Sequence, residues 1–274
     1  MNITFFRPSP ELRPYIESFW VFESPNGFPA TDSSVVTPNG CSKLIIPCEN
    51  SIVSVASGRV DISREQRLYF VGNRDSSTLL QSSSRKTSFI AIEFCPHGAF
   101  PVFGIPMAET FNGLWAADTL FDKWGREIQE VLNNLQQVDQ KVVFIQDELI
   151  HLLRKNDCRN DLVEYCVQLL KSSDGRMAIQ QLAQQTGYSR RYLDLLFREH
   201  VGLSPKVLAG IFRFQKFYRK WATGQSFDLV KEDLYEHYYD QSHFSKEFTK
   251  MTGHPPRKFF AEVSNEFGRR LTLR

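Results

Sequence analysis

Residues 238–248 read YYDQSHFSKEF, and TGHPP follows at 252–256. An earlier part of the chain is similar, because residues 187–197 read GYSRRYLDLLF and VGLSP follows at 201–205. Three pairs of residues in the two segments each lie 51 positions apart: Phe197 and Phe248, Gly202 and Gly253, Pro205 and Pro256. This internal repeat predicts two small helical units, each with a turn and a polar helix, as in two adjacent helix-turn-helix modules.

The first unit has the pattern of two helices joined by a glycine turn. Residues 178–186 place apolar side chains on one helical face, and Gly187 suits a helix end that needs positive φ. The next helix turns its leucines and Phe197 inward. Its cap and outward residues are Ser189, Arg190, Arg191, Asp194 and Arg198. Arginine can bind guanine edges and phosphates, so we predict a DNA-reading helix; a solvated amphipathic helix pair is the alternative.

The second unit repeats this design with different polar residues. Asp240 can cap its helix, and Phe244 and Phe248 face inward. The residues predicted to face DNA are Gln241, Ser242, His243, Ser245 and Lys246. Between the units, residues 206–221 predict a helix with Ile211, Phe214, Tyr218 and Trp221 on one side. Such a helix can hold two recognition helices for successive major-groove faces, about 34 Å apart.

Residues 176–260 resemble the tandem helix-turn-helix domain of the AraC/XylS family of bacterial transcription regulators. The matching residues are Leu182-Ala183, Gly187-Tyr188-Ser189, Leu196-Phe197-Arg198, Gly202-Leu203-Ser204-Pro205, Arg213-Phe214, Asp240-Gln241-Ser242-His243-Phe244, Phe248, Gly253 and Pro256. The resemblance implies a sequence-specific regulator that binds the major groove of double-stranded DNA. It also makes RNA polymerase a candidate partner, and it leaves activation or repression, the operator and the target genes open.

The chain departs from this family in the second unit. Glu232, Asp233 and His237 stand where the family has an apolar residue, an alanine and a turn glycine. Loss of a positive-φ glycine costs on the order of 1 kcal/mol. In the first unit, Asp194 can accept from a cytosine amino group or repel phosphate. These differences keep a second interpretation open, in which the chain is a ligand- or protein-binding scaffold whose divergent helix-turn-helix half has reduced or lost DNA binding.

The N-terminal half has a β-rich pattern. Short apolar runs separated by Gly, Asn and Ser turns predict strands at 43–46, 52–55, 68–71 and 88–94. After residue 120 the pattern becomes helical, with an apolar stripe of Trp124, Ile128, Val131, Leu132 and Leu135 and further helices at 142–153 and 162–170. We therefore predict an α+β protein: a small N-terminal β-barrel or sandwich, following helices, and an all-α domain of two helix-turn-helix subdomains joined by a linker helix.

The N-terminal half also resembles an uncharacterised cupin-like domain that is often fused to AraC-type modules. The similar segments are Pro8-Ser9-Pro10-Glu11-Leu12, Phe19-Trp20, Pro38-Asn39-Gly40-Cys41, Val71-Gly72 and Phe94-Cys95-Pro96-His97-Gly98-Ala99. This resemblance implies a sensor for a small-molecule effector, whose identity it does not give. We expect the sensor at 1–120, a helical linker or dimerisation region at 121–172, and the DNA-binding domain at 173–274, in a monomer or homodimer.

Charge and cysteine content favour a cytoplasmic DNA-binding protein. Residues 171–274 hold 18 Lys and Arg against 11 Asp and Glu, whereas residues 1–170 hold 15 against 20. The basic half is therefore the half with the repeat, as phosphate binding requires. The five cysteines are odd in number and irregularly spaced, which favours reduced thiols. We expect no signal peptide and no contact with a membrane.

Signatures of catalysis and of metal binding are missing from the sequence. The N-terminal half has only His97 and His151, which are far apart, and no phosphate loop or nucleophile elbow is present. We expect no enzyme activity, cofactor or metal, and we expect the cysteines to pack in the core. One set of aromatic residues can line an apolar pocket, although a core role is favoured: Trp20, Phe22, Phe28, Phe94, Phe100 and Phe103.

Overall fold

The centre of the N-terminal half is β9 (Thr87–Phe94), a strand whose residues are all buried. It lies between β2 (Ile16–Ser24) and β4 (Lys43–Glu49) in an antiparallel sheet of order β1-β2-β9-β4-β7-β10. Because both faces of this sheet are covered, the residues of β9 do not alternate between buried and exposed. The computed structural model describes residues 1–156, 158–227, 238 and 240–273.

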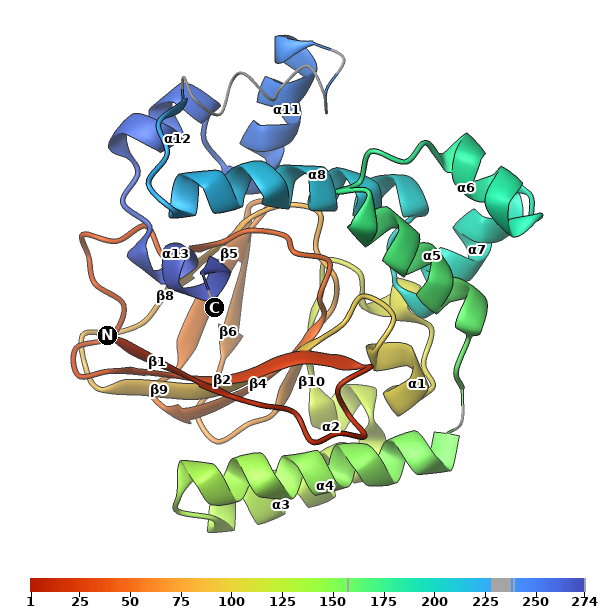
Figure 1. Ribbon diagram of the computed structural model, residues 1–274. Coiled ribbons are helices and arrows are strands. Elements are labelled where there is room, and N and C mark those ends of the chain that lie inside the picture. The colour runs from red at the N-terminus through yellow and green to blue at the C-terminus, as the bar shows by residue number, and fades with distance from the viewer. Residues whose placement is uncertain (157, 228–237, 239, 274) are drawn as a thin grey trace.

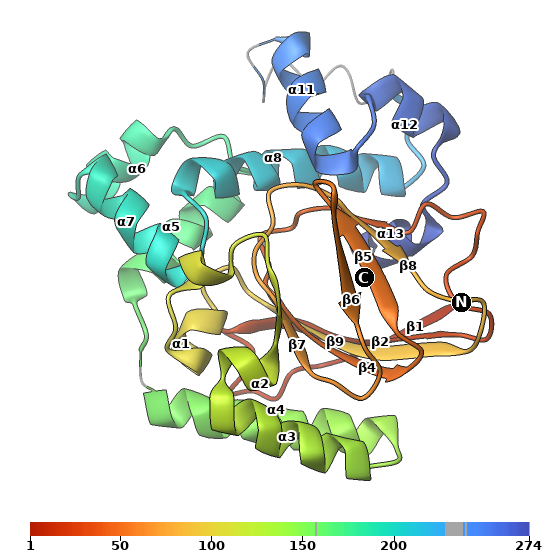
Figure 2. The same cartoon turned by 180° about the vertical axis from the view of Figure 1, so that it is seen from behind.

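A second antiparallel sheet faces the first and completes a small sandwich (Figures 1 and 2). The other strands of the larger sheet are β1 (Asn2–Phe6), β7 (Tyr69–Val71) and β10 (Leu114–Ala116). The second sheet has the order β3-β8-β5-β6, with β3 (Val35–Val36), β8 (Thr78–Gln81), β5 (Ile52–Ala56) and β6 (Arg59–Ser63). Trp20, Phe22, Ile52 and Phe89 form a buried cluster. The four predicted runs lie on β4, β5, β7 and β9, so the predicted β-sandwich is confirmed.

Helices cover the outer face of the larger sheet (Figure 1). They are α1 (Ala99–Phe103), the 3-10 helix η1 (Met107–Thr110), α2 (Ala117–Leu120), α3 (Asp122–Asn134) and α4 (Val138–Asn156). Ile128 and Leu132 of α3 join the core formed with β2 and β9. Val131, which the predicted stripe included, is instead 40% exposed because it lies on the side of α3 away from this core.

Of the remaining described helices, six form a second core, and the seventh, α13 (Glu266–Thr272), packs on the β-domain. The six are α5 (Asp161–Ser172), α6 (Ile179–Thr186), α7 (Arg190–His200), α8 (Pro205–Ala222), α11 (Gln241–Thr252) and α12 (Pro256–Glu262). The predicted inner face of α8 is buried throughout, with Ile211, Phe214, Tyr218 and Trp221. The division at residues 120 and 172 stays a prediction; α3 and α4 pack on the β-domain, whereas α5 packs in the helical core.

The repeat at a spacing of 51 has the same geometry in both copies. Phe197 and Phe248 are both fully buried. Gly202 and Gly253 both have φ of 79°, a left-handed conformation that favours glycine. Proline follows in each copy at the start of the next helix, α8 or α12. The repeat is therefore a structural repeat of recognition helix, turn and proline-initiated helix.

The last helix, α13, returns to the β-domain (Figures 1 and 2). Phe267 is fully buried, and its ring centroid lies 5.3–6.2 Å from those of Trp20, Phe22 and Phe28. Asn265 accepts from the Val35 amide at 2.9 Å and donates to the Val35 carbonyl at 2.9 Å. The C-terminal segment thus completes a core whose other buried members lie between residues 20 and 91.

Candidate functional site

Helix α7 presents four of its five predicted contact residues on an exposed surface. Ser189 caps the helix by accepting from the Tyr192 amide at 3.2 Å, and Arg190 and Arg191 are exposed. Asp194 is half-buried and pairs with Arg198, with 3.0 Å between Oδ2 and Nε. In this conformation the aspartate orients the Arg198 guanidinium and partly balances its charge.

Helix α11 presents the second predicted set. Its cap is Asp240, which accepts from the His243 amide at 2.7 Å. Of the residues predicted to face DNA, four are exposed, namely Gln241, Ser242, His243 and Lys246, and Ser245 is half-buried. Phe244 and Phe248 face the core as expected. The substituted positions Glu232, Asp233 and His237 lie outside the described residues.

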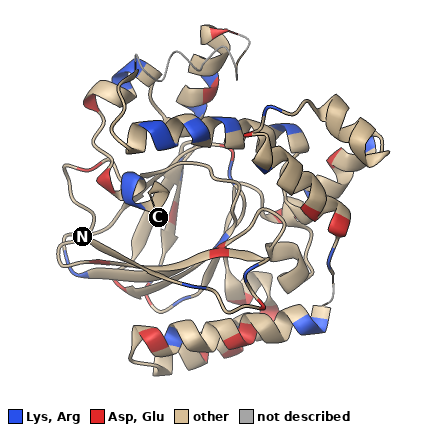
Figure 3. Ribbon diagram, viewed as in Figure 1, with Lys and Arg blue, Asp and Glu red and all other residues tan. Residues whose placement is uncertain are grey.

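Helix α8 separates the two recognition helices. It has 18 residues, which gives a length of about 27 Å. Helix α7 packs near one end of α8, and α11 and α12 pack toward the other (Figures 1 and 2). Lysines and arginines recur along α8 (Figure 3). Arg213 among them is structural, because its Nη1 donates to the Gly175 carbonyl at 2.7 Å. Helix α8 therefore lies between the two modules and carries basic side chains along its length.

A cavity of about 90 Å³ lies between the two sheets of the β-domain. Its apolar wall comes from both sheets, and its charged residues are Lys43 and Arg74. Of the six aromatic residues predicted as core or pocket, Trp20 lines this cavity and also packs in the aromatic cluster. The others pack elsewhere in the cores of the β-domain. The residue Arg74 had no distinguishing sequence pattern, since it lies in a turn segment.

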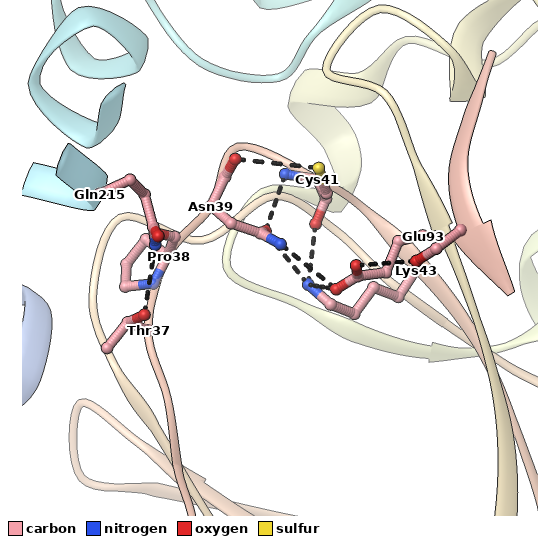
Figure 4. Close-up of polar contacts among 8 residues, drawn as sticks. Thr37, Pro38, Asn39, Cys41, Lys43, Glu93 and Gln215 are labelled. Carbon is pink, nitrogen blue, oxygen red and sulfur yellow. Dashed lines mark hydrogen bonds and ion pairs between the residues drawn. The ribbon is translucent and has the colours of Figure 1, made fainter. Parts of the chain in front are cut away.

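One wall of the cavity is hydrogen-bonded to α8 (Figure 4). Gln215 of α8 donates to the Thr37 hydroxyl at 3.2 Å and also to the Pro38 carbonyl. The neighbouring Asn39 donates to Glu93 at 3.2 Å and accepts from Lys43 at 3.3 Å. Glu93 is 3% exposed and pairs with Lys43 at 3.4 Å. A buried ion pair with these added hydrogen bonds holds the wall in place, and Gln215 links that wall to the helix between the two modules.

A second wall segment, residues 72–77, contacts both helix-turn-helix modules. Asn73 is buried and donates to the Val201 carbonyl, which ends the first recognition helix, at 2.7 Å. Asp75 pairs with Lys250 of α11 at 2.6 Å. Burial raises the pKa of Asp75, but hydrogen bonds from Lys250 and Asn112 outweigh it, so the pKa lies below its usual range. The sequence identified neither contact, because both depend on the docking of the two domains.

The described cysteines and histidines are not gathered into a metal-binding group. In the ranges described above, all five thiols are free and no group of three His, Cys, Asp or Glu side chains is placed to hold a metal ion. Burial raises the pKa of Cys95 to about 12 and that of Cys166 to about 11, so both thiols are protonated at neutral pH.

None of the helices described here has the length and apolar composition to cross a bilayer.

Two family models match separate parts of the chain. A domain of unknown function, DUF6597, matches residues 4–114, and a helix-turn-helix domain matches residues 182–262. The first corresponds to the β-domain. The second runs from α6 to the end of α12 and includes both predicted recognition helices. No curated protein matches the chain in sequence.

Similarity to a solved structure extends across nearly the whole chain. ToxT from Vibrio cholerae covers 91% of this chain and 100% of its own, with 13% identity and a TM-score of 0.50. A ToxT structure with a bound unsaturated fatty acid covers 91% and 98%, with 14% identity and a TM-score of 0.47. The EutQ protein of Clostridium difficile covers 34% of this chain and 67% of its own, with 15% identity and a TM-score of 0.26. The chain thus joins an N-terminal domain of the DUF6597 family to a C-terminal AraC-type helix-turn-helix domain, in a ToxT-like fold.

Proposed function

We propose that this protein is a sequence-specific transcription regulator that places α7 and α11 in successive major grooves of one DNA duplex. The observation that carries the proposal is the repeat itself: two capped helices of matching geometry present polar surfaces and are separated by α8. Arg190, Arg191 and Lys246 are exposed on these surfaces. Arginine and lysine in such positions bind guanine edges and phosphates.

The β-domain is the proposed effector-binding part of the regulator. It encloses a cavity between its sheets, and wall residues of that cavity contact the DNA-binding half through Gln215. A ligand that favours one arrangement of these walls would shift the population of DNA-binding conformations, provided that its affinity for the two arrangements differs. A ToxT structure contains a bound fatty acid, and this supports a small-molecule effector as the general class.

A second function is favoured by one observation on α7. Tyr188, Tyr192 and Leu195 are 45–59% exposed, and the two tyrosine rings stack with centroids 5.0 Å apart. An exposed apolar and aromatic surface on a helix is typical of a protein-binding site. In this alternative, the helical half binds a protein partner instead of DNA and the β-domain binds a ligand as before.

A salt series distinguishes the two functions. The full chain would be titrated, by fluorescence anisotropy, into labelled fragments from upstream of its own gene, with an excess of unrelated competitor DNA. We expect a slope of about −4 to −7 in log affinity against log salt, because about four to eight phosphates would be neutralised. A flat response, or no binding at low salt, would reject the regulator and favour the protein-binding alternative.

A further inference from the structure

Two of the five cysteines lie opposite one another where the antiparallel pair of strands β4 and β9 ends. Lys43, at the start of β4, is paired in register with Glu93 near the end of β9. In an antiparallel ladder, each step back along one strand matches one step forward along the other. Two such steps place Cys41 opposite Cys95, just beyond the paired residues of the strands.

Contacts on both sides of the two cysteines show that this register continues to them. The amide of Phe94 donates to the Ser42 carbonyl at 2.9 Å, which adds one more pair to the ladder. Gly40 packs beside Pro96, because a Cβ atom on Gly40 would lie 3.7 Å from Pro96 Cγ. The two cysteines therefore lie between a hydrogen-bonded pair and a pair in contact.

The position of the two cysteines in the ladder suits a disulfide. Opposite residues alternate between hydrogen-bonded and non-hydrogen-bonded pairs. Since the neighbouring pair, Ser42 and Phe94, is hydrogen-bonded, Cys41 and Cys95 form a non-hydrogen-bonded pair. The Cα atoms of such a pair lie about 4.5 Å apart, which is within the range of about 4.4–6.8 Å for disulfides. The backbone thus needs little movement for the two sulfur atoms to bond.

The register places both thiols on the face of the sheet that carries the ion pair of Lys43 and Glu93. Alternate residues of a strand share a face, and each cysteine is two positions from a member of this pair. The charge of a Cys95 thiolate raises the pKa of Cys41, as expected for neighbouring sulfur atoms. In the reduced chain each thiol donates to a separate oxygen, at 3.8 Å for Cys41 (Figure 4) and 3.7 Å for Cys95. Rotation about each Cα–Cβ bond can turn the sulfur atoms toward one another.

Burial and the surrounding charges govern how fast the two thiols react. Burial is the main cause that raises both pKa values, to about 12 for Cys95. The charged groups around the thiols are Glu17, Lys43, Glu93 and Lys171. The carboxylates raise the thiol pKa values and the lysines lower them. Since the thiolate is the reactive form, oxidation should be slow at neutral pH and should become faster as pH rises.

Cys41 belongs to a segment of the β-domain that contacts α8. It lines a cavity of about 330 Å³ between the β-domain and this helix, so a small oxidant can reach it. Gln215 of α8 donates to the Thr37 hydroxyl at 3.2 Å, and Leu208 of the same helix packs against Gly40. A bond from Cys41 to the end of β9 would fix this segment against the larger sheet and thereby change its contacts with α8.

We propose that Cys41 and Cys95 form a disulfide when the protein meets a peroxide, and that small thiols reverse the reaction. Cys95 is half-buried, whereas Cys41 is 9% exposed, so the Cys95 sulfur attacks the peroxide first. The O–O bond breaks, and a sulfenic acid and one water form. The Cys41 sulfur then displaces the hydroxyl group, which leaves as a second water with the thiol proton. The peroxide gains the two electrons that the thiols lose. In the reverse reaction, two small thiols become their own disulfide by exchange.

Tryptic mapping of the full chain tests the pairing. Trypsin should release Cys41 on residues 1–43 and Cys95 on residues 87–123, while Cys48 lies on a third peptide, residues 44–59. After treatment with hydrogen peroxide and alkylation of the remaining thiols, we expect a disulfide-linked product of the first two peptides. Dithiothreitol should remove it. Its rate of formation should rise about tenfold between pH 7 and pH 8, as the thiolate fraction does.

Cys48→Ser is the matched control. Cys48 lies on the same strand β4 and burial raises its pKa too, but its part of the ladder pairs with Phe89 and Ser88. This variant should form the linked product at the unaltered rate. A linked product that contains Cys48, or peptides that are oxidised but never linked, would overturn the pairing.

The second experiment measures the effect on α8, and it rests on the proposed function. DNA affinity of the full chain would be determined before and after oxidation. We expect a change of about five-fold or more, which should be absent in Cys95→Ser and unaltered in Cys48→Ser. Equal affinity of the oxidised and reduced chains would overturn the effect on α8 and leave the disulfide standing. No DNA binding by the reduced chain would instead reject the proposed function, whereas the peptide mapping does not depend on DNA.

Discussion

Lys250 on the second recognition helix pairs with Asp75 of the β-domain, with 2.6 Å between Nζ and Oδ2. This ion pair joins α11 to a turn that lies 175 positions away in the chain. Lys250 is 54% exposed and Asp75 21% exposed at the side chain, so solvent screens much of the attraction. The pair therefore positions α11 more than it stabilises the fold.

Asp75→Asn and Lys250→Gln should show weak coupling in urea unfolding. We expect a coupling energy of about 0.2–1 kcal/mol in the double-mutant cycle, which is typical of exposed ion pairs. Because the pKa of Asp75 is lowered in the folded state, the contribution is present at neutral pH and is lost as pH falls through that lowered pKa. Lys246→Gln, on the same helix, is the control. If the effects of the two single substitutions on the free energy of unfolding simply add in the double variant, the ion pair contributes nothing to stability.

Arg191→Ala and Lys246→Ala should affect DNA binding differently. If Arg191 contacts a base, its loss should cost about 1–3 kcal/mol and relax specificity at one position. If Lys246 contacts a phosphate, its loss should weaken all sequences alike and reduce the salt slope by about 1. Lys123→Ala, an exposed lysine of α3, is the control. Unchanged affinity in both variants would mean that neither helix enters the groove.

Phe267→Ala should destabilise the β-domain although the residue lies in the last helix. Its ring is fully buried against Trp20, Phe22 and Phe28, so we expect a loss of about 3–5 kcal/mol in the free energy of unfolding. Leu273→Ala, at a position that is 51% exposed, should change it by less than about 0.5 kcal/mol. Similar effects of the two substitutions would contradict the packing of α13 in this core.

Mild acid should loosen the contact between the β-domain and the first module. His97 and His200 line one small pocket there, and burial lowers the pKa of both, although the negative charges of Glu164 and Glu199 oppose this. The unfolded chain, with histidine pKa values of about 6.5, therefore binds more protons than the folded chain. Stability contributed by the neutral rings is complete above that value and falls as pH decreases below it.

Melting temperatures between pH 7.5 and 5.5 test this expectation. The decrease toward pH 5.5 should be smaller in the double variant His97→Gln with His200→Gln. His151→Gln is the matched control, because His151 is exposed on α4. An identical pH profile in the double variant would show that these rings do not govern the acid response.

The repeat was predictable because its determinants are local. The positive φ of Gly253 and the cap that Asp240 forms on α11 involve only neighbouring residues, so spacing and residue type were enough. The outward side chains of α7 followed from helical periodicity in the same way. The strands at 43–46 and 88–94 were likewise visible as apolar runs bounded by turns.

Contacts between domains were not predictable from such patterns. The pattern around residues 73–75 predicts an ordinary turn. The contacts of Asn73, Arg74 and Asp75 depend instead on which elements pack beside that turn. Phe267 falls within the predicted DNA-binding domain at 173–274, because the residues next to it in sequence give no sign of a distant partner such as Trp20. The strand β2, which supplies Trp20, was also not predicted; its apolar run Phe19–Phe22 is short and is flanked by polar residues such as Glu17 and Glu23.

The burial of Phe267 sets an order of events during synthesis. The ribosome synthesises residues 1–116, which contain all the strands that the structure describes, long before residue 267 leaves the exit tunnel. Until then, Trp20, Phe22 and Phe28 lack one of their aromatic neighbours, and the nascent β-domain has an open hydrophobic site. Its final closure therefore waits for the helical half of the chain, so the domain should become fully resistant to proteases only after residue 267 has left the ribosome.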